Sequence, residues 1–475
     1  MAEVLTPDIC VIGGGPGGLS VAAAAAAFGV PTVLIERHKM GGDCLNTGCV
    51  PSKALLAAAR RAEMVQSAGT FGVVAQGIID FSKVYDHVHG VIAAVAPTDS
   101  AERFSALGVR VIRETARFKD RNTVVAGEIQ IRARRFVIAT GSKPAVPPIP
   151  GLDGGPYLTN ETIFDLRERP EHLIIIGGGP VGLEMAQAFR RFGSSVTVLE
   201  AAAKPLAKDD PECAAVVIDR LEREGVIIRS GVKVIGIAHA GHSVTATIEI
   251  ARAEQTITGS HLMVATGRTP SIEGLDLDAA RIRYDRTGIR VNGKLKTNNR
   301  RVYAIGDCAA GQMQFTHAAN YHAELVIRNA LFRLPVRVNN SAVPRVTYTE
   351  PELAQTGLTE AQARERRIRV RVARWPYHDN DRAQTERETH GHIKVITTRK
   401  GRIVGATIVG AQAGELIGLW TLAITRGLDM RALTNFVLPY PTLSELGKRV
   451  AIDFFAPSLT SPWVRRIIGW LRIFG

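Results

Sequence analysis

Apolar runs of four or five residues, each followed by a glycine-rich turn, occur at two places along the chain and predict buried parallel strands. Residues 8–36 (DICVIGGGPGGLSVAAAAAAFGVPTVLIE) and 172–200 (HLIIIGGGPVGLEMAQAFRRFGSSVTVLE) follow one order: an apolar run, glycines spaced G-x-G-x-x-G, a helical stretch, and a second apolar run ending in glutamate. Such short continuous runs indicate strands buried on both faces. The chain therefore contains an internal repeat of a β-α-β unit, which predicts a doubly wound α/β fold.

The glycines and the terminal acid of each copy have distinct physical roles. The first glycine permits the tight turn, the second lets the backbone approach a pyrophosphate, and the third lets the helix pack closely on the sheet. The phosphates would then lie at the positive end of the helix, and the acid would accept hydrogen bonds from a ribose diol. These residues are Gly13, Gly15, Gly18 and Glu36 in the first copy and Gly177, Gly179, Gly182 and Glu200 in the second.

Two dinucleotide sites in one chain predict hydride transfer between two different dinucleotides, and a flavin with a nicotinamide is the expected couple. At the second site Glu200 is followed by three alanines, 201–203, so no arginine is placed there for a 2′-phosphate. The carboxylate would also repel that phosphate. We therefore expect NADH rather than NADPH.

Three further strand-and-turn segments fit the same plan. VIATGSKP (137–144) and MVATGRTP (263–270) are each a strand that ends at a glycine turn, and we expect them to close the two nucleotide-binding domains. TNNRRVYAIGDCA (297–309) is a strand that ends at Gly-Asp, and its carboxylate is a candidate ligand for the polyol chain of a flavin. The candidate contacts in these segments are Thr140, Gly141, Gly267, Arg268, Gly306 and Asp307.

The composition is that of an ordinary globular protein and argues against several classes of function. The chain is 45% hydrophobic and 22% charged, and no apolar stretch is long enough to span a bilayer. The N-terminus lacks a basic-then-apolar signal pattern, so we expect a cytoplasmic location. The net charge is +14, and RERRIRVRVAR (364–374) alternates so as to predict a half-buried strand with an arginine outer face. No stacking aromatic residues accompany it, and we expect no nucleic-acid partner.

The five cysteines are too few for a disulfide framework, but two of them stand in an unusual segment, GGDCLNTGCVPSK (41–53). In a regular helix, positions i and i+5 lie roughly 8–9 Å apart, whereas a disulfide needs Cα atoms within about 7 Å. A Cys44–Cys49 bond therefore requires an irregular helix start, which the nearby glycines and Pro51 permit. A zinc site would need further Cys or His ligands close by, and structural disulfides are rare in the cytosol. We favour a redox-active dithiol/disulfide couple and no metal site.

With these motifs the chain resembles the class I pyridine nucleotide–disulfide oxidoreductases, which include dihydrolipoyl dehydrogenase, glutathione reductase and mercuric reductase. The resemblance spans nearly all 475 residues. It implies FAD in the first site, NAD(P)H in the second, and a homodimer formed by the C-terminal domain. The expected fold is α/β, with two Rossmann-like three-layer domains and an α+β dimerisation domain. The expected ranges are 1–150 completed by 275–340 for FAD binding, 151–274 for NAD(P) binding, and 341–475 for dimerisation.

The resemblance also implies roles for single residues. Cys49 would lie against the flavin as the charge-transfer thiolate, and Cys44 would be the interchange thiol that faces the substrate. Lys53, one helical turn beyond Cys49, would pair with Glu184 beside the flavin. Further cofactor contacts are expected at Gly42, Ala116, Val234, Thr316 and His317.

One position departs from the disulfide-reducing relatives. Those enzymes carry a His-Pro near the C-terminus with a glutamate five residues after the His, whereas VLPYPTLSELGKR (437–449) has Tyr440 in place of the His and retains Glu445. Tyrosine is a poor base at neutral pH. A tyrosine here is similar to mercuric reductase, yet the chain has no cysteine after Cys308. We therefore expect a mercuric-reductase-like enzyme with an unassigned small-molecule or metal-ion acceptor. A dihydrolipoyl dehydrogenase-type disulfide reductase is the alternative.

The last residues, 458–475, form a basic amphipathic tail. Its apolar positions follow helical spacing and its three arginines add positive charge. Two readings stay open: a helix packed on the dimer body, and a membrane-surface anchor that would suit an NADH:quinone-type oxidoreductase at the inner face of the membrane. The apolar positions are Trp463, Ile467, Trp470, Leu471 and Phe474, and the arginines are Arg465, Arg466 and Arg472.

Overall fold

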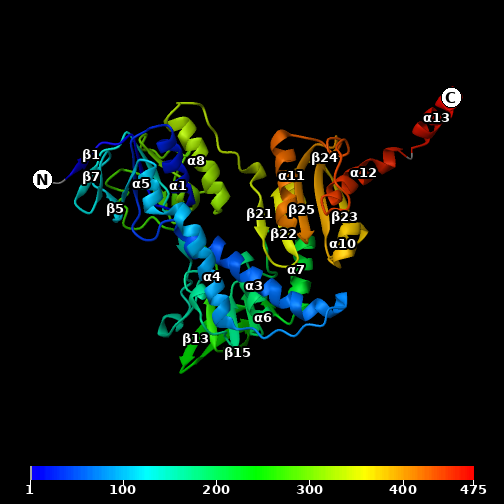
Figure 1. The fold of residues 1–475 in the computed structure, drawn as a ribbon, viewed down its shortest axis with the longest axis horizontal. Helices are drawn as coiled ribbons and strands as arrows, with labels where there is room; N and C mark the ends of the chain where they lie inside the picture. Colours follow the sequence, from blue (N-terminus) through cyan, green and yellow to red (C-terminus); the bar gives the residue numbers. More distant parts are fainter. Residues whose placement is uncertain (1–2, 460, 475) are drawn as a thin grey trace. The chain divides into compact units, whose positions relative to one another are not determined.

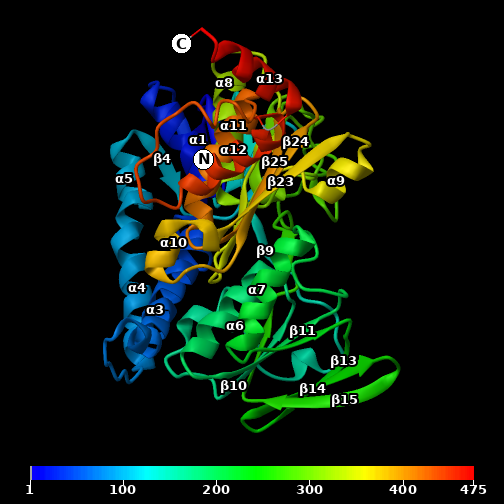
Figure 2. The same ribbon diagram turned by 90° about the vertical axis from the view of Figure 1, so that its right-hand side faces the viewer.

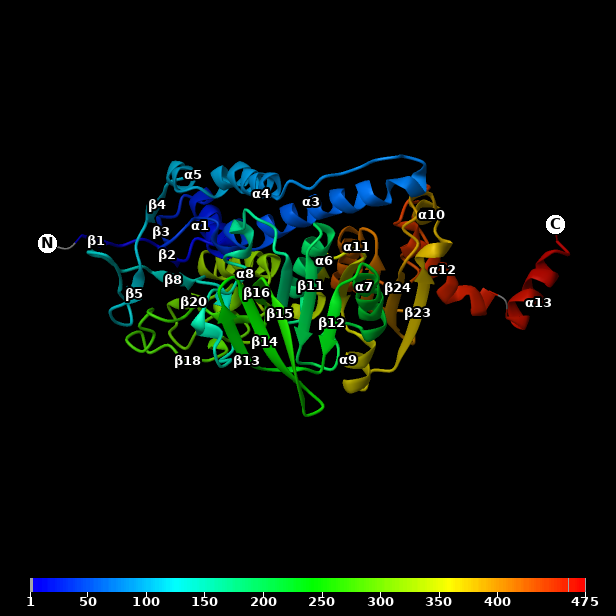
Figure 3. The same ribbon diagram turned by 90° about the horizontal axis from the view of Figure 1, so that it is seen from below.

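The computed structural model describes residues 3–459 and 461–474, drawn as a ribbon in Figures 1–3. The chain divides into two compact units, which are described separately. The first contains the residues up to Ala201 together with Gly231–Asn340. The second contains Ala202–Ser230 together with the residues from Ser341 onwards.

The first copy of the sequence repeat forms a strand, a helix and a parallel strand in the first unit, as predicted. The strand–helix turn is tight because Gly13 has φ +110°, and the helix begins with Pro16, whose fixed φ suits a first helical position. The central sheet has the order β20-β8-β2-β3-β4 and every pair in it is parallel. The elements are β2 (Ile9–Ile12), α1 (Pro16–Ala27), β3 (Thr32–Ile35), β4 (Val109–Ile112), β8 (Arg135–Ile138) and β20 (Val302–Ala304).

The first unit also contains further helices and a second sheet. Helix α8 (Thr316–Ala330) packs against α1, and α3 (Cys49–Ser67) lies beside α4 (Phe81–Val95), as Figure 1 shows. A second sheet has the order β1-β7-β6-β5. The remaining elements are β1 (Val4–Leu5), α2 (Gly42–Asn46), α5 (Ala101–Ala106), β5 (Ala116–Phe118), β6 (Val124–Ala126), β7 (Ile129–Ile131), β18 (Tyr284–Asp285) and β19 (Gly288–Ile289).

The second copy of the repeat also folds as predicted, within the same unit. Strands β11, β10 and β16 lie side by side in that order and are parallel. An antiparallel meander, β13-β14-β15, follows along the chain (Figure 2). A short antiparallel pair joins β9 to β17. The elements are β9 (Ser142–Pro144), β10 (His172–Ile176), α6 (Pro180–Arg191), β11 (Ser195–Glu200), β13 (Lys233–Ala240), β14 (Ser243–Ile250), β15 (Ala253–Gly259), β16 (His261–Val264) and β17 (Arg268–Pro270).

The second unit is built on an antiparallel sheet with the order β21-β22-β25-β24-β23. One face packs against α11 and α12 around a core that includes Trp420, Ile393 and Val395. Helix α7 contacts β22 and β25. The elements are α7 (Pro211–Arg223), β12 (Ile227–Ser230), β21 (Arg345–Thr347), β22 (Glu352–Gly357), α9 (Glu360–Glu365), β23 (Val370–Pro376), α10 (Asp381–Glu386), β24 (His392–Thr398), β25 (Ile403–Gly410), α11 (Ala413–Arg426), α12 (Glu445–Leu459) and α13 (Pro462–Leu471).

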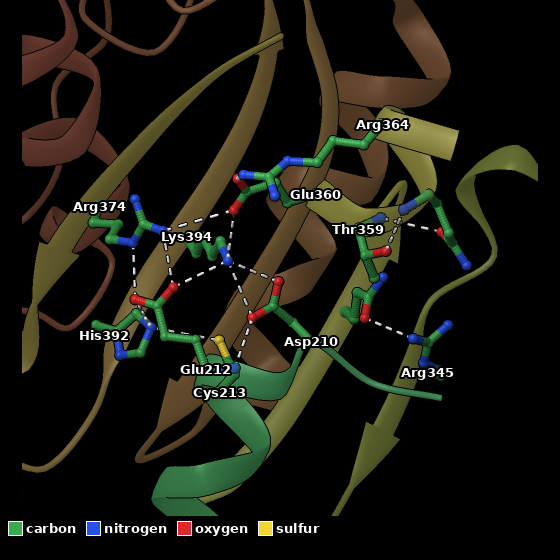
Figure 4. Close-up of polar contacts among 12 residues, drawn as sticks. Asp210, Glu212, Cys213, Arg345, Thr359, Glu360, Arg364, Arg374, His392 and Lys394 are labelled. Carbon is green, nitrogen blue, oxygen red and sulfur yellow. Dashed lines mark hydrogen bonds and ion pairs between the residues drawn. The ribbon is translucent and has the colours of Figure 1, made fainter. Parts of the chain in front are cut away.

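A buried ion-pair cluster joins the start of α7 to this sheet, as Figure 4 shows. Lys394 lies between two core residues of β24, so its side chain points to the opposite face, where it is 4% exposed. Its ammonium group lies 2.9 Å from Asp210, 3.0 Å from Glu212 and 3.1 Å from Glu360. The neighbouring Arg374 makes two hydrogen bonds to Glu212. The buried lysine is therefore fully compensated by carboxylates.

A strand was predicted over residues 364–374, and the first half of this prediction is wrong. Residues 364 and 365 end α9, and Arg367 has φ +54°, so the strand begins only at Val370. Helix α9 starts at a capping box in which Thr359 and Gln362 bond each other's backbone, and this local signal outweighs the alternation. Of the strand arginines, Arg371 stacks 3.8 Å above the Phe454 ring instead of facing only solvent.

Candidate active site

The two cysteines lie on either side of a helix break. Helix α2 ends at Asn46, and α3 begins at Cys49 after Gly48, which has φ −128° and ψ −111°. The irregular backbone predicted from the i, i+5 spacing is thus confirmed. A Cβ atom on Gly48 would lie 2.9 Å from the carbonyl oxygen of Asp43, so only glycine fits this break. Both sulfurs are present as free thiols, with Cys44 half-buried and Cys49 more exposed.

The two thiols differ strongly in acidity because they share one hydrogen bond. Cys44 donates to Cys49, which lowers the pKa of Cys49 to about 6 and raises the pKa of Cys44. The hydroxyl of Thr316, 3.4 Å from the Cys49 sulfur, and the charge of Lys53 lower the pKa of Cys49 further. Cys49 is therefore the thiolate of the pair at neutral pH.

The structure brings Lys53 and Glu184 together across 131 residues of sequence, as the resemblance implies. The Lys53 ammonium group lies 2.9 Å from Oε2 of Glu184, and the Glu184 carboxylate is buried on α6. Lys53 lies on α3, one turn beyond Cys49. The positive charge next to the thiolate is therefore held in place by a buried partner.

Asp43, which the sequence reasoning did not single out, is the polar centre of the cysteine segment. Its Oδ1 accepts hydrogen bonds from the Thr47 hydroxyl (2.8 Å) and the Asn160 amide (3.0 Å). Its Oδ2 lies 3.2 Å from the guanidinium group of Arg268. These contacts tie α2 to two segments that are distant in sequence. In the sequence, Asp43 could have been noticed only because it directly precedes Cys44.

The first glycine turn has the shape that a dinucleotide needs. A Cβ atom on Gly13 would lie 2.4 Å from the Ala139 carbonyl oxygen, and one on Gly18 would lie 1.9 Å from that of Gly13. Gly15 has no such neighbour within 3.9 Å, so the backbone there is open to approach. The Glu36 carboxylate accepts a hydrogen bond from the Gly14 amide at 2.6 Å. The residues present therefore fit a bound dinucleotide.

The cysteine segment contacts this turn directly. The Gly41 amide donates to the Gly14 carbonyl oxygen at 2.9 Å, and a Cβ atom on Gly42 would lie 2.7 Å from the Gly15 Cα atom. Gly42 also has φ +57°. A dinucleotide on the glycine turn would therefore lie close to the helix that carries Cys44.

The second glycine turn repeats the same geometry. Gly177 has φ +115°, and a Cβ atom on Gly182 would lie 2.0 Å from the Gly177 carbonyl oxygen. Gly179 has open space around its Cα atom. The Gly178 amide donates to Oε2 of Glu200 at 2.6 Å, as Gly14 does to Glu36. This turn likewise fits a dinucleotide.

The Gly-Asp turn of Gly306 and Asp307 lies next to the first glycine turn, because the preceding residue packs against the helix that follows that turn. Gly306 has φ +64°, and a Cβ atom on Gly17 would contact Ile305. The Asp307 carboxylate accepts from Ser142 at 2.6 Å, and burial raises its pKa. The Gly306 amide donates to Nδ1 of the fully buried His322, so the proton of that ring lies on Nε2.

The remaining predicted residues lie at defined places in the first unit. The Thr140 hydroxyl donates to the Ser271 carbonyl oxygen at 2.6 Å, and the His317 ring stacks on Phe315 next to Thr316. Gly141 and Gly267 have positive φ angles. Ala116 begins β5 and Val234 lies in β13.

Tyr440 and Glu445 lie in the second unit, whereas the cysteines lie in the first. The Tyr440 hydroxyl donates to Asp381 at 2.8 Å, and this hydrogen bond and charge raise its pKa above the ordinary value. Glu445 begins α12. A tyrosine with a raised pKa remains protonated at neutral pH and cannot act there as a base.

Two protein-family models match most of the chain. A family model described as "Pyridine nucleotide-disulphide oxidoreductase" matches residues 7–323, and the model of its dimerisation domain matches residues 343–451. The mercuric reductase of Streptomyces lividans is 36% identical over 459 residues, covering 94% of this chain and 96% of that protein. The dihydrolipoyl dehydrogenase of Thermus scotoductus is 36% identical over 446 residues, covering 93% and 95%.

A solved structure gives the same fold. The Cu(II) complex of the HOCl-induced flavoprotein disulfide reductase RclA from Escherichia coli superposes with a TM-score of 0.83 at 28% identity, covering 93% of this chain and 98% of that chain. The expected architecture of two Rossmann-type domains and a dimerisation domain is therefore confirmed.

Proposed function

Because this chain belongs to the pyridine nucleotide-disulphide oxidoreductase family, we propose that it passes electrons from NADH to a Cys44–Cys49 disulfide and then to a soft metal ion. Members of the family bind FAD and NAD(P)H, and the dimerisation domain indicates a homodimer in the family. The observation that carries the proposal is the hydrogen-bonded thiol pair with its acidic member, Cys49.

The residues present fit a flavin at the first turn and a nicotinamide dinucleotide at the second. When bound, FAD accepts a hydride from NADH and supplies two electrons to the neighbouring disulfide. Gly13, Gly15 and Glu36 would hold its adenosine and pyrophosphate, and Asp307 would bind its polyol chain. Gly177, Gly179 and Glu200 would hold the nicotinamide dinucleotide.

The proposed reaction at the cysteines is a balanced two-electron exchange. Reduction breaks the Cys44–Cys49 bond with two electrons and one proton, leaving a thiol on Cys44 and a thiolate on Cys49. One Hg(II) ion then takes up two electrons to become Hg(0), or two Cu(II) ions take up one electron each to become Cu(I). The sulfurs rejoin as a disulfide, and the proton on Cys44 is released. Thiolates are the ligands that soft metals prefer. Lys53 and Thr316 stabilise the thiolate form of Cys49 in the reduced pair.

The environment of Tyr440 supports a metal ion over a disulfide compound as electron acceptor. Reduction of a disulfide substrate needs a group that can act as both acid and base near neutral pH. The hydrogen bond to Asp381 raises the pKa of Tyr440, which makes it less suited to this task than an ordinary tyrosine. A relative is named mercuric reductase, and RclA was solved with Cu(II). We assign Tyr440 and Glu445 no proton-transfer role with a metal acceptor.

The second dinucleotide site favours NADH. Oε2 of Glu200 accepts from the Gly178 amide, which leaves the carboxylate close to where a ribose diol would bind. A 2′-phosphate there would meet a negative charge. We expect kcat/KM with NADH to exceed kcat/KM with NADPH. The Glu200→Gln substitution should reduce the ratio of these two values.

A screen of acceptors tests the proposal. The FAD-loaded protein would be assayed for NADH oxidation with Hg(II) in excess thiol, Cu(II), lipoamide, oxidised glutathione and menadione. We expect turnover with a metal ion, which Cys44→Ser and Cys49→Ser abolish while menadione reduction persists. Faster turnover with lipoamide than with either metal would instead support the dihydrolipoyl dehydrogenase alternative. Metal reduction that survives both serine variants would refute the role of the cysteines.

A second candidate acceptor is a quinone in the cytoplasmic face of a membrane, with the protein otherwise in the cytoplasm. The exposed apolar residues at the end of the chain, which include Trp463 and Trp470, favour it. No helix among the described residues has the length and hydropathy to cross a bilayer. Menadione turnover that rises on addition of vesicles, with no metal turnover, would support this candidate.

A further inference from the structure

The last helix carries a dense group of exposed apolar side chains that includes two tryptophans. Helix α13 and the residues after it, up to Phe474, are here called the tail helix. Trp463 is 70% exposed and Trp470 is 60% exposed, and the last two apolar residues, Ile473 and Phe474, are 75% and 71% exposed. Water-exposed tryptophans at this density are costly on a protein surface and mark an interaction site.

The apolar and charged residues of the tail helix lie on separate faces. At about 100° per residue, the arc from Trp470 through Trp463 to Ile468 spans roughly 160° and contains no charge. The three arginines occupy the remaining arc together with Gly469, Pro462 and one apolar residue, Ile473. Ser461 caps the helix by accepting from the Val464 amide, and Pro462 follows at the first helical position, so the helix has its own start signal. The arginines are Arg465, Arg466 and Arg472.

The charge of this segment has one sign. After Asp453 the sequence contains three arginines and no aspartate or glutamate. Among the described residues, no carboxylate forms an ion pair with any of these guanidinium groups. The tail also lies beyond residue 451, where the match to the dimerisation domain ends. The arginines are therefore available to an external anion, and the tail lies outside the part of the chain that the family models match.

We propose that the tail helix docks on the surface of an anionic lipid bilayer. An apolar face with tryptophans suits the boundary between headgroups and acyl chains, and arginines on the flanking face suit anionic headgroups. The helix has 10 residues, so it is too short to cross a bilayer and must lie in the plane of the interface. A second copy of this chain would bring the same positive charge to the contact, which disfavours the tail helix as a self-association surface.

This inference does not rest on the identity of the electron acceptor. Docking needs only the apolar face and the arginines, so it holds for a metal ion, a disulfide or a quinone as acceptor. An anionic surface gains roughly fivefold in affinity per arginine, so the three together predict about a hundredfold preference over a neutral bilayer.

The test is sedimentation of the full-length, FAD-loaded protein with vesicles of phosphatidylcholine, with and without phosphatidylglycerol. We expect binding to the anionic vesicles, about a hundredfold weaker binding to neutral ones, and a loss of binding in Trp470→Ser/Leu471→Ser. Arg465→Gln/Arg466→Gln/Arg472→Gln should abolish the preference for anionic lipid. Val437→Ser, which removes a 92% exposed apolar side chain elsewhere in the same unit, is the matched control and should bind like the parent.

Two further measurements test the proposal if a variant folds or expresses badly. Fluorescence of Trp463 and Trp470 should shift to shorter wavelength with anionic vesicles and be quenched by brominated acyl chains. Light scattering should give the same oligomeric mass for the parent and the Trp470→Ser/Leu471→Ser variant. Equal sedimentation of the parent and the variant with anionic vesicles would overturn the proposal. A dimer that dissociates only in the variant would also overturn it, and would indicate that the tail helix packs between two copies of the chain.

Discussion

The ammonium group of Lys53 lies 2.9 Å from Oε2 of Glu184, a carboxylate buried on α6. Lys53 is one of the groups that lower the pKa of Cys49, and Glu184 partly neutralises it. The pair therefore sets how much positive charge the thiolate of Cys49 meets.

Substitutions at the two residues should move the acidity of Cys49 in opposite directions. Lys53→Met removes the favourable charge and should raise the pKa of Cys49, whereas Glu184→Gln leaves Lys53 uncompensated and should lower it. We expect each shift to be roughly half a pH unit to one unit. The measurement is a thiolate absorbance titration of the reduced protein. Shifts of the same sign in both variants would contradict this account.

Cys49 should be the first thiol of the chain to react as pH rises. Its pKa is lowered to about 6, so its alkylation by iodoacetamide should reach half its limiting rate near pH 6 in the reduced protein. Cys44→Ala and Thr316→Val remove hydrogen-bond donors to the thiolate, and both should move this midpoint to higher pH. The rates are measured by mass spectrometry of the labelled peptides.

Three other cysteines serve as internal controls in that experiment. Burial raises the pKa of Cys10, Cys213 and Cys308, so they should stay unlabelled below pH 9 in the folded protein. Labelling of Cys44 before Cys49 would reverse the assignment of the thiolate.

The sequence predicted the repeated β-α-β units well because each depends on local features: an apolar run, fixed glycines and a helix of suitable length. It also predicted the irregular backbone at the cysteines, because the i, i+5 spacing is incompatible with a regular helix. The hydrogen bonds of Asp43 to Asn160 and of Thr316 to Cys49 join residues more than 100 positions apart. No local pattern encodes such pairs, so the polar surroundings of the thiols emerged only from the fold.

The cluster around Lys394 had no sequence signal for the same reason, and it should contribute strongly to the stability of the second unit. Lys394→Met would leave Asp210, which is 2% exposed, without its ammonium partner. Breaking a buried ion pair from one side costs about 3–5 kcal/mol. Urea unfolding followed by tryptophan fluorescence reports on this unit, because all four tryptophans of the chain lie in it.

A matched control for that substitution is Arg223→Met. Arg223 pairs with Asp219 on the exposed side of α7, where both side chains are more than half exposed. Loss of an exposed i, i+4 pair should cost about 0.5 kcal/mol or less. Equal destabilisation by the two substitutions would show that the buried cluster contributes no more than a surface pair.

His322 should make the first unit less stable in acid. Burial lowers its pKa to about 4, below the ordinary value near 6.5 of an unfolded histidine. Between these values the unfolded chain binds a proton that the folded chain does not, so stability is full above pH 6.5 and falls as pH drops towards 4. The loss of unfolding free energy should be at most about 3–4 kcal/mol.

Hydrogen exchange of the β2 and β8 amides between pH 4 and 7 measures this loss in the first unit, which contains no tryptophan. His322→Gln cannot be protonated in this range, so its stability should vary less steeply with pH than that of the parent. A parallel pH dependence in both proteins would assign the effect to other groups.

The break between α2 and α3 gives the two sulfurs unequal mechanical support. Cys49 begins a helix of 19 residues, whereas Cys44 belongs to one of five residues that is tethered through Asp43. A group that bonds to Cys44 would therefore have to displace a short helix that Asp43 holds to two other segments, whereas Cys49 is the more exposed sulfur. Reagents of graded size should thus discriminate between the two positions by fit as well as by charge.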